Sequence, residues 1–207
     1  DECDSILRKR GGGATGDGSF GGAARDGVVN QILGGSASSR LFRELRDRRG
    51  LSYGAYSTLD CGKYAGDITS SISVSPEGAS EAFDVLYGAL ATLCSGPLTD
   101  DELDHAKRFL VGSFAQRASG VAGLASLATA GWLHDLSDDV WSKAASQITA
   151  IDLATARETA ASWFRPESST WVIVGPPQTL SEMESTLVTK GLAVSYGTMS
   201  ELESISD

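Results

Sequence analysis

Two hydrophobic spacings divide this chain of 207 residues into elements. Apolar residues three or four positions apart predict helices, and apolar residues at every second position predict strands. The predicted helices cover residues 23–33, 40–49, 76–93, 99–114, 121–133, 138–148, 153–164 and 181–190. The predicted strands cover residues 51–58, 64–74, 170–174 and 192–196. This order predicts an α/β sandwich of the α+β type, in which helices pack against a largely antiparallel sheet.

Two of these elements are predicted to be buried. The helix Val121–Leu133 is apolar on every side and rich in alanine and glycine, which is typical of a closely packed interior helix. Residues Thr170–Val174 form a short apolar run, which favours a buried strand. Thr99 and Glu102 have the spacing of a capping box and mark a helix start.

The N-terminal part of the chain has a different composition. Seven glycines occur between residues 11 and 22, without apolar periodicity. We therefore divide the chain into a glycine-rich segment, residues 1–27, expected to be flexible, and one domain, residues 28–207. Residues Gly16–Gly21 match G-x-G-x-x-G, but a dinucleotide site needs a buried strand before the first glycine, and Gly-Gly-Gly-Ala-Thr at 11–15 is not one.

The most informative segment is GGSASSRLFRELRDRRGLSYGAYS, residues 34–57. Two glycines end one helix, one of the serines at 36, 38 and 39 caps the next, and Gly50 stops it. Arg46 falls in the last turn of that helix and Tyr53 in the strand that follows, so the two side chains can face one site. Five arginines against one glutamate and one aspartate make residues 40–49 a basic island in an acidic protein.

Arg46 and Tyr53 have a plausible chemistry of their own. A tyrosine hydroxyl can donate a hydrogen bond to a carbonyl oxygen that becomes negative in a tetrahedral transition state. An arginine offers a planar, charged fork to carbonyls or to a carboxylate. The alternative is a solvated helix end and a tyrosine packed on a neighbour.

The chain resembles the C-terminal, zinc-free half of the pitrilysin or insulinase family of inverted-zincin metallopeptidases. The resemblance rests on NQILGG, SSRLFRELRDRRGLSYG, LTDDELDHAKRFLVGSF and WVIVG, in this order and spacing, from about Val28 onward. An arginine followed seven residues later by a tyrosine matches the family's substrate-binding pair at Arg46 and Tyr53.

This resemblance implies that the active site is shared between two halves of the peptidase. In the family, one half carries H-x-x-E-H and zinc, and the other reaches the peptide substrate with the arginine and the tyrosine. This chain has no H-x-x-E-H. It is therefore expected to hold no cofactor, to lack activity alone, and to pair with a zinc-bearing homologous subunit or, failing that, with itself.

One departure from the family concerns the first sheet strand. The family's half-domain opens with a strand, and here residues 3–10 and the glycine loop hold that place. The strand is expected to be short or absent, leaving a sheet edge open. Two alternatives to a peptidase subunit therefore stay open: an assembly subunit that keeps the fold without peptidase function, and peptide binding at the open edge.

Composition and charge disfavour several other classes of function. The net charge of −10 disfavours nonspecific binding to nucleic acid or acidic membranes, and no apolar run is long enough to span a bilayer. No secretory signal is visible, so a soluble protein is expected, with no compartment indicated. His105 and His134 lack the i, i+4 spacing of a zinc helix, and the three cysteines lack C-x-x-C spacing. No metal ligands are predicted.

Overall fold

The elements follow the order expected for an α+β fold. A computed structural model describes residues 3–12, 20–61, 65–163 and 165–197. The strands are β1 (Cys3–Gly12), β2 (Ala55–Cys61), β3 (Ala65–Val74) and β4 (Thr170–Val174). The helices are α1 (Phe20–Leu33), α2 (Arg40–Phe42), η1 (Arg43–Arg48), η2 (Pro76–Gly78), α3 (Ala79–Ser95), α4 (Asp100–Ala118), α5 (Val121–Leu133), α6 (Val140–Ala150), α7 (Leu153–Trp163), η3 (Pro166–Ser168) and α8 (Pro177–Thr189).

The sheet is antiparallel throughout, with the strand order β2-β3-β1-β4. The expectation that the first strand is short or absent is wrong. Strand β1 has ten residues and lies in the middle of the sheet, where Ser5 is paired with Ile72 of β3 and with Ile173 of β4. Main-chain hydrogen bonds on both sides hold this strand, and they do not require the apolar alternation that the sequence search relied on.

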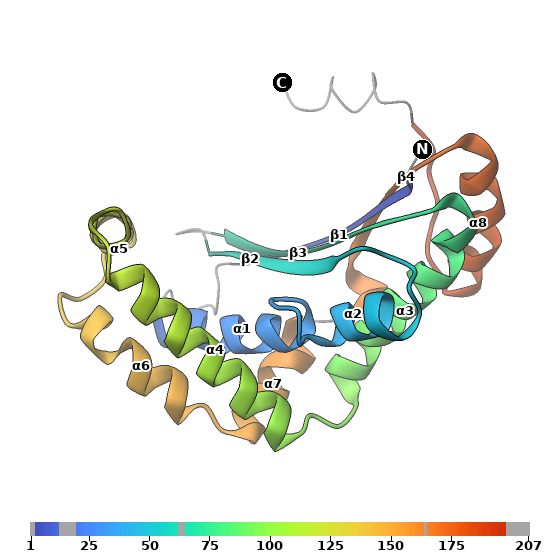
Figure 1. Cartoon of the computed structure of the whole chain (residues 1–207). Coiled ribbons are helices and arrows are strands. Elements are labelled where there is room, and N and C mark those ends of the chain that lie inside the picture. Colours follow the sequence, from blue (N-terminus) through green and yellow to red (C-terminus); the bar gives the residue numbers. More distant parts are fainter. Residues whose placement is uncertain (1–2, 13–19, 62–64, 164, 198–207) are drawn as a thin grey trace.

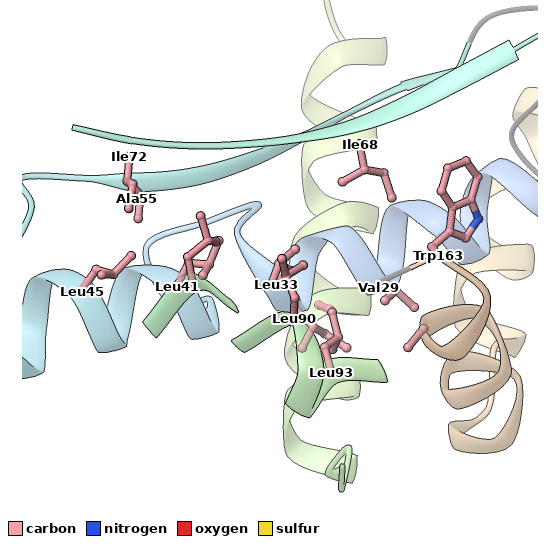
Figure 2. Packing of buried hydrophobic residues seen from close by; sticks show 14 of the residues in the cluster. Val29, Leu33, Leu41, Leu45, Ala55, Ile68, Ile72, Leu90, Leu93 and Trp163 are labelled. Carbon is pink, nitrogen blue, oxygen red and sulfur yellow. The ribbon is translucent and has the colours of Figure 1, made fainter. Parts of the chain in front are cut away.

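Helices cover one face of the sheet, and we call the opposite face, over which no described helix or strand lies, the open face (Figure 1). Ala55, Ile68 and Ile72 point from the sheet toward the helix layer, where α1, α2 and α3 supply leucines (Figure 2). Leu33, Leu41 and Leu45 are fully buried in this layer. On the opposite face of the same strands, Tyr56, Ser71 and Ser73 are exposed. The α+β sandwich with an antiparallel sheet is confirmed.

The edge of the sheet at β2 is covered at Ser57 by the end of α1. Ser57 donates its backbone N–H to Gly34 O at 2.9 Å, and Asn30 Nδ2 donates to Ser57 O at 3.2 Å. A Cβ on Gly34 would lie 2.5 Å from the Ser57 nitrogen, so only glycine allows this approach. The backbone groups that an added peptide strand would need at Ser57 are already used.

Near the C-terminal end of the described chain, two expectations are wrong. Thr170–Val174 does form strand β4, but none of its residues is buried, because β4 is an edge strand of a sheet with one open face. Residues 192–196 form no strand. Leu192 and Val194 still pack against the core, so the apolar alternation is real, but it is satisfied without strand pairing.

Helix α5 is also not the buried helix that its sequence predicts. Leu127 is its only buried residue, while Val121 is 87% and Trp132 is 82% exposed. The helix packs mainly on α4, with Gly131 beside Trp141 of α6. The described residues therefore cover only one side of it. No helix in the described ranges is both long and apolar enough to cross a membrane.

Candidate functional site

The helix that carries Arg46 begins and ends as its sequence predicts. Ser39 is the N-cap, and its Oγ accepts a hydrogen bond from Phe42 N–H at 3.4 Å. The helix continues from α2 into η1, a π-helical stretch. Gly50, at φ +63°, ends it, and Leu51 N–H donates to Leu45 O at 2.8 Å.

The side chain of Arg46 is held by two aromatic rings. Its Cζ atom lies 4.9 Å from the ring centroid of Phe42 and 4.8 Å from that of Tyr53. Within the described residues, no carboxylate lies within ion-pair distance of Arg46. Cation–π contact therefore orients the guanidinium while its charge stays free for a ligand.

Tyr53 lies beside Arg46, but it is not in the strand. It occupies the turn before β2 and is 86% exposed. Ser52 anchors this turn: its Oγ lies 2.7 Å from Gly54 O and 2.8 Å from Ser73 O, and it accepts from Gly54 N–H at 3.3 Å. The sequence analysis missed Ser52, whose type carries no signal apart from its place beside Tyr53.

Tyr56 extends the aromatic cluster onto the open face of the sheet. Its ring centroid lies 6.0 Å from that of Phe42, so Tyr56, Phe42, Arg46 and Tyr53 form a continuous series of contacts. Gly54 makes room for this ring, because a Cβ at Gly54 would lie 2.6 Å from Tyr56 Cε2. The sequence analysis did not single out either residue.

A hollow of about 570 Å³ lies next to this cluster, lined by residues 51–54, Tyr56 and residues 71–75 of β3 and its end. It is open to solvent and has both polar and apolar walls. The exposed Tyr53 lines this space, in which an extended peptide could lie, and Arg46 contacts the ring of Tyr53. The geometry brings the two predicted residues together, and their role stays a prediction.

The rest of the basic island is largely neutralised. Arg40 forms a bidentate ion pair with Glu102, and Arg48 forms an ion pair with Glu44. Arg49 Nη1 lies 2.7 Å from Glu81 Oε1. Partial burial alone would raise the pKa of Glu102, but hydrogen bonds from Arg40 and Thr99 lower it below its ordinary value. The Arg49–Glu81 and Arg40–Glu102 pairs attach the helix to α3 and α4, while Arg48–Glu44 lies within the helix, so these pairs support the site rather than offer charge to a ligand.

The described residues do not fit a metal ion. No three histidine, cysteine, aspartate or glutamate side chains among them lie close enough to hold one. His105 instead lies 2.7 Å from Ser38 Oγ through its Nε2 atom.

Burial, with Asp26 and Asp60 nearby, raises the pKa of the Cys61 thiol to about 11. Residues 16–19 of the glycine motif lie outside the described residues.

Comparison with known proteins supports the resemblance seen in the sequence. Residues 23–110 match the family described as the peptidase M16 inactive domain. An uncharacterized zinc protease of Bacillus subtilis is 34% identical over 86 residues, which is 42% of this chain. The matched part spans about a fifth of that relative, 21% of its length.

Solved structures share the fold. The peptidase M16 inactive domain from Pseudomonas fluorescens has a TM-score of 0.74 and 25% identity, covering 84% of this chain and 40% of that one. The inactive peptidase domain of a putative zinc protease from Bordetella parapertussis has a TM-score of 0.70 and 15% identity, covering 85% of this chain and 93% of that one. The resemblance to the C-terminal, inactive domain of this peptidase family is confirmed.

Proposed function

We propose that this chain, whose residues 23–110 match the peptidase M16 inactive domain, is the zinc-free half of a pitrilysin-like zinc metallopeptidase. The observation that carries the proposal is the pairing of Arg46, whose charge has no carboxylate partner among the described residues, with the exposed Tyr53 beside an open hollow. Arg40 of the same helix is instead paired with Glu102 and holds the helix to α4.

Each residue has its own task in this proposal. Arg46 binds main-chain carbonyls or a carboxylate of the peptide, because its guanidinium is oriented by two rings before the peptide arrives. Tyr53 donates its hydroxyl hydrogen to the scissile carbonyl oxygen as negative charge develops there. Hydrolysis takes place on a partner half that carries H-x-x-E-H and zinc, so the chain alone does not cleave.

The test is a reconstituted peptidase, made by mixing this chain with an H-x-x-E-H partner that restores cleavage. We expect Tyr53→Phe to lower kcat by about 10²-fold, as for the loss of one oxyanion donor, with no change in folding. Arg46→Ala should raise KM at least as much as it lowers kcat, because the guanidinium also binds the ground state.

Tyr196→Phe is the matched control. Tyr196 is also exposed, but its hydroxyl lies near Glu184 and Leu180 of α8, outside the hollow. The reconstituted peptidase with Tyr196→Phe should cleave at the wild-type rate. If Tyr53→Phe also cleaves at that rate while it stays folded and paired, Tyr53 is structural. The chain would then be better described as an assembly subunit with this fold.

A further inference from the structure

Helix α5 presents a continuous apolar face to solvent. Its thirteen residues include no charged side chain, in a chain with a net charge of −10. Val121, Leu124, Ala128 and Trp132 recur at intervals of three and four, and all are exposed. We call these four residues the outer face of α5.

The position of α5 is fixed by its inner side. A Cβ on Gly123 would overlap the backbone oxygen of Arg117, so glycine lets α5 begin close against the end of α4. A Cβ on Gly131 would lie 3.3 Å from Trp141 Nε1, and Leu127 is buried. The outer face is therefore held outward, and it does not turn inward to find cover within the described residues.

We propose that the outer face of α5 is a docking surface for the zinc-bearing half, separate from the Arg46–Tyr53 site. This inference rests on the proposed function, since it names a contact of the same partner. A helix without charged residues that leaves large apolar side chains in water marks a contact surface for another body. The described chain covers one side, and a partner must cover the other.

The area of the outer face of α5 indicates how large a partner must be to bind it stably. A helix of this length is about 20 Å long and about 10 Å wide, so its outer face offers on the order of 200 Å². A stable interface buries about 800 Å² on each partner. Two copies of this chain joined only through α5 would fall far short, so the occupant must contact a wider area.

The open face of the sheet supplies that wider area. Helix α5 rises out of the helix layer to the level of the sheet, at the end opposite α8 (Figure 1). A body lying over the open face would therefore also lie beside α5. The Pseudomonas fluorescens relative has room for such a body, because this chain covers only 40% of it.

The experiment measures binding of the H-x-x-E-H chain by sedimentation. Leu124→Glu should weaken binding at least about tenfold, because an apolar contact would receive an unpaired charge. Ala128→Glu should act in the same way. Val188→Glu is the matched control: Val188 is as exposed as Leu124, 58% against 54%, but lies on α8 at the far end, and its variant should bind like wild type.

The outcomes separate this inference from the proposed function. Equal affinity of all three variants and wild type for the zinc-bearing chain would overturn the docking surface. So would a homodimer of this chain that Leu124→Glu abolishes, if the same variant binds the zinc-bearing chain as tightly as wild type. At saturating partner, Leu124→Glu should keep wild-type kcat, whereas Tyr53→Phe should pair normally and cleave slowly. Weakened pairing in Leu124→Glu with full cleavage in Tyr53→Phe would keep the docking surface and reject the role of Tyr53.

Discussion

The guanidinium of Arg46 lies over the ring of Tyr53, with 4.8 Å between Cζ and the ring centroid. One residue comes from the end of a helix and the other from a turn that leads into a strand. Gly50 reverses the chain between them, and Phe42 supports the guanidinium from the preceding helical turn. The pair is therefore formed without a ligand, which would lower the entropy cost of binding the peptide proposed for this site.

Ser52 is expected to position Tyr53. Replacing it with alanine removes the hydroxyl that ties the turn to Gly54 and Ser73. We expect Ser52→Ala to lower the free energy of unfolding by about 1 kcal/mol, as for one net hydrogen bond. In the reconstituted peptidase it should lower kcat more than it raises KM, because the oxyanion donor becomes misplaced. An unchanged kcat together with the stability loss would show that Ser52 is structural only.

Gly54 is expected to be required for the aromatic cluster. In Gly54→Ala the new methyl group would lie 2.6 Å from the Tyr56 ring and displace it from Phe42. We expect a loss of about 1 kcal/mol or less in the free energy of unfolding, because the half-exposed Tyr56 ring can shift away from the new methyl group. The control is Gly88→Ala in α3, where nothing lies within 4 Å. It should stabilise the protein by about 0.5–1 kcal/mol, and thermal unfolding of both variants checks the contrast.

The ion pair of Arg40 with Glu102 is expected to make stability depend on pH. The folded-state pKa of Glu102 is lower than its ordinary value of 4.5. The stabilisation is therefore fully present above the ordinary pKa and is lost as pH falls through the lower folded pKa. We expect Glu102→Gln to cost about 2 kcal/mol at pH 7, since its hydrogen bonds involve charged groups, and to approach wild type only as pH falls below the lowered folded pKa.

Glu44→Gln provides the comparison for that titration. Glu44 pairs with Arg48, whose side chain is 63% exposed, so the loss should stay below about 1 kcal/mol at pH 7. Denaturant titrations of both variants at several pH values measure the two curves. A constant deficit of Glu102→Gln across the acid range would contradict the linkage.

Local patterns predicted those features that depend on neighbouring residues. The Thr99–Glu102 capping box is present, with Glu102 N–H donating to Thr99 Oγ1 at 3.2 Å. The stop at Gly50 and the strand at 170–174 also lie where they were predicted. These features are determined within a few residues of chain, so a single sequence is enough to find them.

The sequence by itself determined the helix with Arg46 and the antiparallel α+β plan, whereas it placed Tyr53 in a strand and the structure places it in the turn before β2. Only the tertiary structure decided that β1 lies in the middle of the sheet, because main-chain pairing with β3 and β4 leaves no apolar pattern to read. The tertiary structure also decided that α5 faces solvent. An apolar sequence indicates that a helix favours burial, but whether it is buried depends on which other elements pack against it. The anchor at Ser52 belongs to the same group, because its partner at Ser73 is close in space and distant in sequence.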